Sequence, residues 1–375
     1  MNHPWGEPSL NVRDLLRLSS VPRLGPLKIR ALVTHFGDPE AVLRAEPRDL
    51  IRVPGIDRKL ASAIVRHDGE NFADEQLRAV NRIGGCILPY WDDSYPSLLK
   101  KIYDPPPLLY VLGGFTEIDR HAMGIVGTRT PSSYGQRVTE NLTRELMEAG
   151  ITVVSGLARG IDTIAHETAL KAGGRTIAVI GSGLDVPYPP ENRRLLQRIA
   201  RQGVVMSEFP LGTQPEAPNF PRRNRLISGI SLGVIVVESD EDGGAMITAS
   251  TALDQNREVF AVPGMITERR SIGPHLLIQQ GRAKLVHTVN DVLVEFPALA
   301  GSSRSQERQA MPLPELTLFE NTVLESLSNE PVHIDALSER ASLSTSDCLV
   351  TLLSLEFKGL VRQLPGKFFV KAEGF

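Results

Sequence analysis

Residues 124–135 read GIVGTRTPSSYG, an apolar run that ends at a glycine and leads through a short polar loop into a helical pattern. An apolar strand followed at once by a loop of small residues and a helix is the repeating unit of doubly wound α/β sheets. The free N–H groups at the start of such a helix favour an anion beside them. This stretch therefore predicts a parallel sheet with a phosphate-type loop at its edge.

The same pattern recurs between residues 121 and 296. Six short runs are apolar throughout, as is typical of strands buried on both faces of a parallel sheet. They are Met123–Gly127, Ile151–Ser155, Thr176–Gly181, Val204–Ser207, Gly233–Glu238 and Glu258–Pro263. Four stretches between them are long enough for crossover helices, namely Tyr134–Ala149, Ile161–Lys171, Glu191–Arg201 and Ala245–Asn256. The central part of the chain is therefore predicted to be a doubly wound α/β domain.

The predicted strands end in small or polar residues. Because the carboxyl ends of parallel strands lie along one edge, where ligands bind in this class of fold, small residues there let a ligand approach the backbone. The strand ends are Gly127-Thr128-Arg129, Ser155-Gly156, Gly181-Ser182-Gly183, Ser207–Pro210, Glu238-Ser239 and Pro263-Gly264. We expect an anion site that spans several loops of this edge.

Residues 220–231, FPRRNRLISGIS, place three arginines behind a phenylalanine at the start of a helical pattern. The guanidinium groups of Arg222, Arg223 and Arg225 can hold phosphate oxygens bidentately, and the ring of Phe220 can stack on an unpaired base. The alternative is a surface helix with solvated arginines. Together with the loop at 124–135, the segment favours a protein that holds a nucleic-acid backbone.

Composition limits the class of protein. The chain has 375 residues and a formal net charge of −3, so it has room for two or three domains and no global positive field to attract a polyanion. The two cysteines, Cys86 and Cys348, lack the spacing of a disulfide framework or a zinc site. No basic-then-apolar leader or run of about 18 apolar residues is present. We expect a cytoplasmic protein with no membrane segment, metal or cofactor.

Residues 1–75 are expected to form a small helical domain. The segments 50–57, LIRVPGID, and 21–25, VPRLG, each predict a tight hairpin between two helices, in which a glycine supplies a positive φ. They resemble a pair of helix-hairpin-helix motifs, which contact DNA phosphates in other proteins. The alternative is a domain of the sterile-alpha-motif type, in which the hairpins serve only for packing. Residues 76–120 are expected to connect this domain to the next, with residues 86–112 extended and irregular.

The chain beyond residue 296 divides into a linker and a small domain. Residues 297–316 are rich in serine, glycine and proline and predict a linker. Residues 317–375 contain three helical patterns, Phe319–Leu327, Ile334–Ala341 and Ser346–Lys358, and a closing hairpin, which together predict a winged helix. The expected recognition helix has no Arg or Lys over residues 344–352, which favours a protein-contact or accessory role.

No catalytic constellation emerges from the sequence. A P-loop motif is absent, and residues 181–186, GSGLDV, lack the third glycine of a dinucleotide fingerprint. His166 lies within a helical pattern and is interpreted as a packing residue. The acidic residues between Glu238 and Asp242 form one run, interpreted as a solvated turn. The chain is therefore not expected to be an enzyme.

The motifs and their order resemble the DNA-processing protein A family, also called DprA/Smf. The motifs are GTRTPSSYG (127–135), SGLARGID with AHETAL (155–170), AVIGSGLDVPYPPEN (178–192), SEFPLG (207–212), FPRRNRLISGIS (220–231), GGAMITAS (243–250) and AVPG (261–264). The resemblance implies an extended Rossmann-like domain that binds single-stranded DNA and loads the RecA-type recombinase onto it in natural transformation. It also implies a homodimer. Two departures are Ala245-Met246, where the family usually has Ser-Leu, and His275, where an Asn is common.

The resemblance implies a role for particular residues at the sheet edge. Gly127, Thr128 and Arg129 are expected to hold a phosphate at the helix N-terminus opened by Ser133 and Tyr134, and Phe220 to stack on a base. The whole expected DNA site comprises Gly127, Thr128, Arg129, Ser133, Tyr134, Gly135, Ser155, Gly156, Gly181, Ser182, Phe220, Arg222, Arg223, Asn224, Arg225 and Thr248.

Two other classes of function are alternatives to DNA binding. A Rossmann-like nucleotide phosphoribohydrolase, of the lysine-decarboxylase-like type, would need a carboxylate such as Glu238 at the strand ends, beside the glycine loop at 243–248. A purely structural scaffold would leave two arginine-bearing loops on one sheet edge without an explanation.

Overall fold

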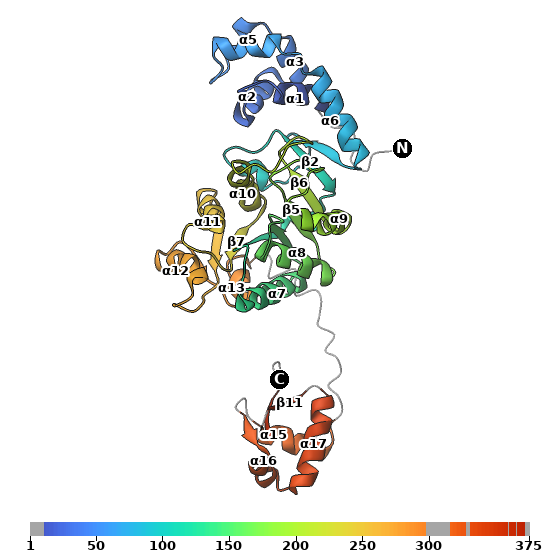
Figure 1. Ribbon diagram of the computed structural model, residues 1–375, viewed down its shortest axis with the longest axis vertical. Helices are drawn as coiled ribbons and strands as arrows, with labels where there is room; N and C mark the ends of the chain where they lie inside the picture. Colours follow the sequence, from blue (N-terminus) through green and yellow to red (C-terminus); the bar gives the residue numbers. More distant parts are fainter. Residues whose placement is uncertain (1–10, 298–315, 328–330, 359, 365, 372–375) are drawn as a thin grey trace. The chain divides into compact units, whose positions relative to one another are not determined.

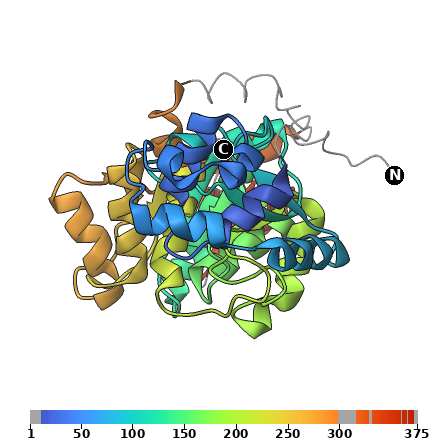
Figure 2. The ribbon, with the colours of Figure 1, turned by 90° about the horizontal axis from the view of Figure 1, so that it is seen from above.

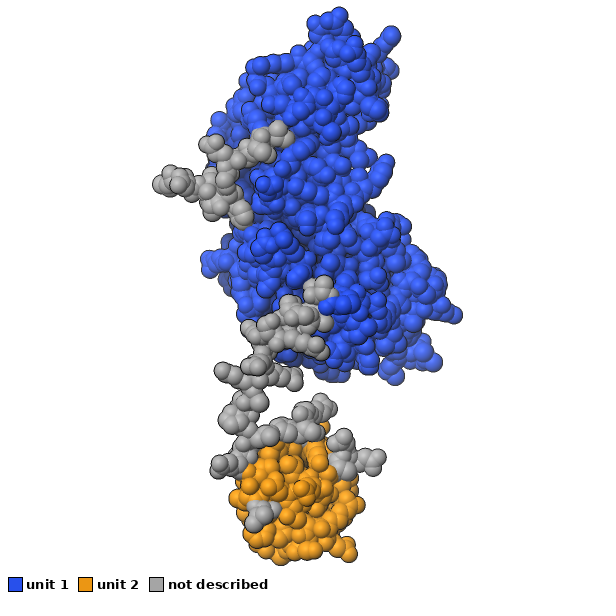
Figure 3. Space-filling model, turned by 180° about the vertical axis from the view of Figure 1, so that it is seen from behind, with its two compact units in different colours: residues 1–303 blue, residues 304–375 orange. Residues whose placement is uncertain are grey.

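The computed structural model describes residues 11–297, 316–327, 331–358, 360–364 and 366–371. The chain divides into two compact units, Met1–Ser303 and Arg304–Phe375, which Figure 3 colours separately. The predicted linker at 297–316 lies, apart from its two end residues, outside the described part of the chain. The domain boundaries given above stay predictions.

A mixed sheet of nine strands forms the centre of the first unit, counted over residues 11–297. Its order is β1-β2-β6-β5-β4-β3-β7-β8-β9, and all neighbours from β6 to β9 are parallel. The strands are β1 (Cys86–Pro89), β2 (Leu108–Gly113), β3 (Ala122–Val126), β4 (Thr152–Ser155), β5 (Thr176–Val179), β6 (Val204–Ser207), β7 (Gly233–Val236), β8 (Glu258–Ala261) and β9 (Lys284–Leu285). The six strands predicted from the sequence are β3 to β8, so the parallel sheet is confirmed.

The expectation of an irregular connection over residues 86–112 is wrong at both ends. β1 and β2 pair with each other, and β2 continues the sheet by antiparallel pairing with β6. The three prolines at 105–107 directly precede β2, whose first four residues are buried. The prolines do lie in a loop, as expected. The residues after them form a strand because they hydrogen-bond to the edge of β6, which is distant in the chain.

Helices cover both faces of the sheet, as Figure 1 shows. Met123 and Ile125 of β3 pack with the helices of one face, while Ala122 and Val126 pack with those of the other, because side chains alternate along a strand. The first face carries α7 (Ser133–Glu148), α8 (Ile161–Lys171) and α13 (Val289–Leu293), with α9 (Arg193–Gln202) packed on β5 and β6. The second carries α10 (Asn219–Ile230), α11 (Gly244–Asp254) and α12 (Ile272–Gln279). Figures 1 and 2 agree that α12 and α9 lie on opposite flanks.

The sheet reverses its winding beside β3. The chain moves outward from β3 through β4, β5 and β6, and then returns to place β7 on the other side of β3. The loops that follow β3 and β7 therefore leave the sheet in opposite directions. This divergence opens a crevice at the carboxyl edge, which is the usual ligand position in open α/β sheets.

The N-terminal helices pack on the antiparallel end of the sheet. They are α1 (Val12–Ser19), α2 (Pro26–Phe36), α3 (Pro39–Arg44), α4 (Pro47–Leu50), α5 (Arg58–Arg66) and α6 (Glu70–Arg82). Both predicted hairpins form with a left-handed residue. In the second hairpin it is a glycine as expected, Gly55 with φ of 83°, but in the first it is Arg23 with φ of 69°, while Gly25 is extended with φ of −80°. The amide of Gln76 exchanges two hydrogen bonds with the backbone of Leu211, which ties α6 to the central domain.

The second unit is a winged helix. It contains α15 (Leu318–Ser326), β10 (Val332–His333), α16 (Ile334–Ala341), α17 (Thr345–Phe357), β11 (Val361–Leu364) and β12 (Phe368–Lys371). The three strands form a small sheet in the order β10-β12-β11. The three predicted helices and the closing hairpin are confirmed. The two-residue strand β10 was missed because it is too short for a pattern. Across the described ranges of both units, no helix has the length and apolar character needed to cross a bilayer.

Candidate nucleic-acid interface

The loop after β3 is held by backbone hydrogen bonds. The N–H of Thr128 donates to the carbonyl of Glu238 over 2.7 Å, and the carbonyl of Thr128 accepts from the N–H of Ile161 over 3.2 Å. These bonds connect the loop to the end of β7 and to the first turn of α8. Arg129 is therefore presented from a backbone that is already fixed, as a preorganised binding group requires.

A carboxylate of the chain itself fills the N-terminus of α7. Glu238 is 2% exposed and accepts from the backbone N–H of Ser132 over 2.9 Å and from the Ser132 hydroxyl. Ser132, rather than Ser133 or Tyr134, caps the helix, since its hydroxyl oxygen accepts from the N–H of Gly135 over 3.1 Å. A Cβ at Gly135 would lie 2.4 Å from the Glu238 carboxylate, so glycine is needed there. The interpretation of Glu238 as part of a solvated turn is wrong.

Tyr134 lies beside this helix start and remains accessible. It is 42% exposed, and its hydroxyl donates to the carbonyl of Pro263 over 2.7 Å. Partial burial, followed by the charge of Glu238, raises the pKa of the Tyr134 phenol. Its exposed ring lies at the carboxyl edge, close to the loop after β8.

Arg223 is buried beneath the edge and holds two strand ends together. It is 5% exposed, and its Nη1 donates to the carbonyls of Gly156 and Val179, which follow β4 and end β5. A Cβ at Gly156 would lie 2.2 Å from that nitrogen, so the glycine is required by the arginine. Burial lowers the pKa of Arg223 to about 10, against an opposing contribution from Asp162. Arg223 therefore supports the site from below.

Asp162 and His166 complete this buried polar cluster. The Asp162 carboxylate accepts from the N–H groups of Gly156 (3.0 Å) and Ala158 (3.3 Å), which fixes the loop after β4. His166 is fully buried, and its Nδ1 lies 2.7 Å from the hydroxyl of Thr176. Burial, and then the charge of Arg223, lower the pKa of His166 to about 3. The interpretation of His166 as a packing residue is confirmed.

The remaining arginines of the 220–231 segment differ in exposure. The side chain of Arg225 is 11% exposed and pairs with Glu208 and with Asp104, at 3.3 Å from the Asp104 carboxylate. The side chain of Arg222 is 56% exposed, and its guanidinium carbon lies 5.0 Å from the centre of the Phe209 ring. Of the three arginines, only Arg222 has its charge at the surface.

Three hydroxyl groups of the expected site are committed to the backbone. Ser155 donates to Ile125 over 2.7 Å, Ser182 donates to Val186 over 2.6 Å, and Thr248 donates to Gly244 over 3.4 Å. All three residues are at most 2% exposed. They shape the strand ends and helix starts and do not present their hydroxyl groups to a ligand.

The accessible part of the edge is centred on Arg129 and Phe220. The Arg129 guanidinium carbon lies 6.0 Å from the centre of the Phe220 ring, which is half-buried, and the centre of the Tyr188 ring lies 5.7 Å from that of Phe220. Arg129 is exposed, and no carboxylate pairs with it within the described ranges. Tyr188 and Arg159, which pairs with Glu191, lie outside the site expected from the sequence, although both belong to the motifs at the strand ends.

Two hollows meet at these residues. The larger, about 340 Å³, lies at the switch point between the loops after β3 and β7, and Gly127, Thr128 and Asn224 are among its lining residues. The smaller lies on the side of β4 and β5 and is lined by Gly181, Tyr188 and Arg159, among others. Arg129, Ala158, Phe220 and Arg223 line both. A ring, a free guanidinium and backbone loops can hold an anion and a flat group side by side.

Comparison with known proteins assigns the family. The sequence pattern described as "DNA recombination-mediator protein A" matches residues 86–297, more than half of the chain. The chain belongs to the DprA/Smf family. The pattern of the DprA winged helix domain matches residues 307–367, and that of the SAM-like helix-hairpin-helix tandem matches residues 15–67. The resemblance derived from the motifs is therefore confirmed along most of the chain.

Several members of the DprA/Smf family are similar to this chain, one of them along nearly its whole length. Protein Smf of Synechocystis is 35% identical over 94% of this chain and 96% of its own. The DNA processing protein DprA of Bacillus subtilis is 43% identical over 64% of this chain and 82% of its own. Among solved structures, DprA of Streptococcus pneumoniae gives a TM-score of 0.68 at 35% identity, covering 76% of this chain and 98% of that one. DprA of Helicobacter pylori, whose structure concerns a single-stranded DNA binding mode, gives a TM-score of 0.51 at 31% identity, covering 57% of this chain and 96% of that one.

The buried His166 predicts a pH dependence of folding. Its pKa is about 6.5 when unfolded and about 3 when folded, so between these pH values the unfolded chain binds more protons and stability falls as the pH drops. Between pH 7 and pH 5 the loss from this group is about 2 kcal/mol. Denaturant unfolding at both pH values should show this loss in the parent chain and a smaller one in His166→Gln. An equal loss in both would mean that the ring is not held neutral.

Proposed function

We propose that this protein binds single-stranded DNA at the carboxyl edge of its sheet and acts as a recombination mediator. In this proposal it loads a RecA-type recombinase onto incoming DNA in natural transformation, in the cytoplasm and without catalysing a reaction itself. The observation that carries the proposal is the pairing of an uncommitted guanidinium, Arg129, with a half-buried ring, Phe220, at the switch point of the sheet. The single-stranded DNA named for the H. pylori relative supports it.

The phosphate contacts are proposed for the loop after β3 and its neighbours. Arg129 supplies a charge-assisted contact, and Arg222 and Arg159 extend the positive track along the edge, although each also lies near a carboxylate. Gly127 and Thr128 line the larger hollow and let the strand approach the backbone. The helix N-terminus of α7 contributes less than the sequence suggested, since Glu238 already occupies it.

Phe220 is proposed to stack on a base. Phe220 lines both hollows, and its ring lies close to the Arg129 guanidinium and to the Tyr188 ring. Stacking on an aromatic side chain is tolerant of sequence, because every base has a flat face. We therefore expect binding with little sequence preference and with a preference for unpaired over paired DNA.

The deeper residues of the expected site are proposed to have a supporting role. Arg223 and Asn224 anchor α10, and Ser155, Gly156 and Ser182 keep the strand ends in place. Arg225 is removed from the proposed phosphate contacts, because its guanidinium is held by Glu208 and Asp104.

The phosphoribohydrolase alternative has less support. It needs an accessible carboxylate at the strand ends, and Glu238 is buried and takes hydrogen bonds from Ser132. Among the described residues, no three His, Cys, Asp or Glu side chains cluster as a metal site either. A test for ribose-phosphate release from nucleoside monophosphates should therefore give no turnover.

The recombinase and the homodimer are the finer parts of the proposal. Exposed apolar residues at the α11–α12 flank of the central domain favour a contact between two copies there: Ile247, Met265, Ile266 and Ile272 are 45%, 74%, 90% and 38% exposed. A constant mass near 41 kDa in light scattering would contradict the dimer. Recombinase filament growth on DNA that is already coated with single-strand-binding protein should start sooner with this protein present. An unchanged lag would contradict the loading role.

Arg129→Ala should weaken binding to fluorescent oligo-dT by about tenfold, or 1.4 kcal/mol, because one charge-assisted phosphate contact is lost. The slope of log affinity against log salt should fall by about 0.7. Arg144→Ala removes the same charge from an exposed position toward the other end of α7 and is the control. Equal effects of the two changes would mean that Arg129 acts only through net charge.

Phe220→Ala should cost about 1–3 kcal/mol of oligo-dT binding if a base stacks on the ring. Phe220→Tyr keeps the flat ring and should bind nearly as well as the parent chain. Denaturant unfolding of each variant separates stacking from packing. A lower midpoint with unchanged affinity in the alanine variant would leave Phe220 as a packing residue.

A further inference from the structure

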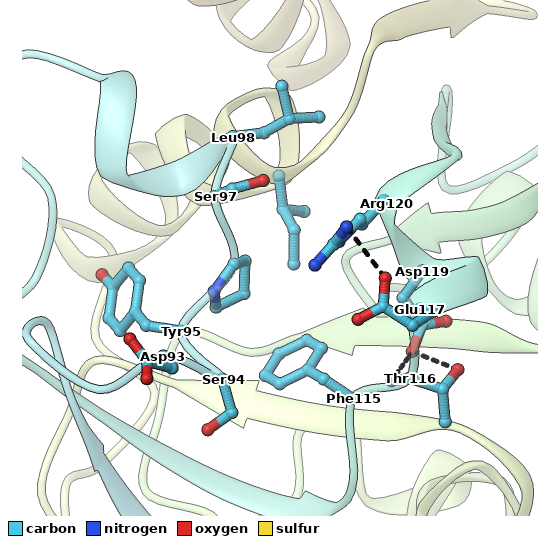
Figure 4. A pocket seen from close by; sticks show the side chains of 12 residues that line it. Asp93, Ser94, Tyr95, Ser97, Leu98, Phe115, Thr116, Glu117, Asp119 and Arg120 are labelled. Carbon is cyan, nitrogen blue, oxygen red and sulfur yellow. Dashed lines mark hydrogen bonds and ion pairs between the residues drawn. The ribbon is translucent and has the colours of Figure 1, made fainter.

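A hollow of about 360 Å³ lies at the opposite edge of the sheet from the DNA site (Figure 4). Its walls come from residues 93–98 after β1, from residues 115–120 before β3, and from Ile230 at the last turn of α10. Since β3 begins at Ala122 and β7 at Gly233, this is the edge of the amino ends. The motifs that identify the family leave this region unexplained.

Five of the twelve lining residues are apolar or aromatic, and we call them the floor of the hollow: Tyr95, Pro96, Leu98, Phe115 and Ile230. Tyr95 and Ile230 are each 2% exposed, and the other seven lining residues are polar or charged. Figure 4 shows the ring of Phe115 pointing into the hollow from the loop that follows β2. A cavity of this size lies at the lower end of the range for ligand pockets, about 300–1,000 Å³, and admits one large side chain with its neighbour.

The rim of the hollow carries one carboxylate without a partner. Asp93 is exposed and makes no hydrogen bond or ion pair within the described ranges. Glu117 and Arg120 neutralise each other across 2.9 Å, as Figure 4 shows. Asp119 is buried and is held by Arg175 at 2.8 Å. Two cations lie just outside the lining, since Lys100 donates to the carbonyl of Asp92 over 2.9 Å and Arg257 donates to the carbonyl of Leu98 over 2.9 Å. Among the lining residues, Asp93 is the one charged side chain without a partner in the described part of the chain.

This combination excludes some occupants. A DNA strand would bring phosphates close to Asp93 and Glu117, and the one arginine of the rim is already paired. A free small molecule would fill the cavity but leave the surrounding surface uncovered. That surface extends over the short helix Glu117–Arg120, where Ile118 is 45% exposed.

We propose that this hollow docks a segment of a partner protein that carries an aromatic side chain next to a lysine or arginine. The aromatic side chain fills the cavity against Phe115 and Ile230, and the basic side chain meets Asp93. An apolar anchor in a pocket with a polar rim is the arrangement in which a few residues carry most of the binding energy. The rest of the segment covers the helix at 117–120.

The placement has a consequence for function. Phe220 lies in the first turn of α10 and Ile230 at its end, so the two residues are separated by about 15 Å along the helix axis, at about 1.5 Å per residue. A bound DNA strand would leave the amino edge free. The protein could therefore hold DNA and a partner at the same time, from opposite edges of one sheet.

The test measures the binding of three capped peptides to the full chain by saturation-transfer NMR. The peptides are acetyl-Gly-Trp-Lys-Gly-amide, its Trp-Glu counterpart and its Ala-Lys counterpart. The Trp-Lys peptide should bind about fivefold more tightly than Trp-Glu, the effect of one exposed ion pair. The Ala-Lys peptide should not bind. Asp93→Asn should remove the difference between the first two peptides, whereas Asp254→Asn, an exposed carboxylate at the end of α11, should preserve it.

Phe115→Ser should abolish binding of the Trp-Lys peptide while oligo-dT binding stays unchanged. If that variant does not fold, Asp93→Asn decides alone, because Asp93 is exposed and its replacement leaves the floor intact. Equal affinity for the Trp-Lys and Trp-Glu peptides in the parent chain overturns the proposal. A loss of oligo-dT binding in either variant overturns it too, since the hollow would then belong to the DNA track.

Discussion

Two buried charged side chains, Glu238 and Arg223, hold the carboxyl edge of the sheet in place. Glu238 joins the end of β7 to the first turn of α7, and Arg223 joins α10 to the ends of β4 and β5. Each forms hydrogen bonds with backbone N–H or C=O groups that have no partner within their own helix or strand. The loops between them can therefore be short, close together and rigid. The exposed residues of the candidate site depend on that rigidity.

The chain uses the same chemistry for support and for the proposed ligand. A helix N-terminus attracts an anion, and in α7 the anion is the carboxylate of Glu238. Guanidinium groups suit oxygen acceptors, and for Arg223 those acceptors are main-chain carbonyls, whereas for Arg225 they are Glu208 and Asp104. Arg129 differs because no group within the described ranges takes its charge. The free guanidinium of Arg129 beside the Phe220 ring therefore distinguishes the proposed binding surface from the buried ion pairs and hydrogen bonds that support it.

The antiparallel extension of the sheet gives the molecule a second surface. β1 and β2 continue the sheet past β6, and the segments beside them form the hollow at the amino edge. The same extension receives the N-terminal helices, through α6 and through Arg30, whose guanidinium carbon lies 4.6 Å from the centre of the Tyr90 ring. Residues 86–113 are thus part of the sheet, the base of the helical domain and the wall of the proposed docking site.

The amino-acid sequence by itself determined the parallel strands, the helices between them, the winged helix and the edge on which the phosphate-type loops meet. Those features follow from local periodicity and from the rule that parallel strands end on one side. It also placed Arg129 and Phe220 on that edge. Tertiary structure alone decided which of three neighbouring arginines reaches the surface, because exposure depends on packing partners such as Glu208, which are distant in the chain. It likewise made strands of residues 86–89 and 108–113, since each is a strand only through hydrogen bonds to a neighbour that is distant in the chain: β2 pairs with β6, and β1 pairs with β2.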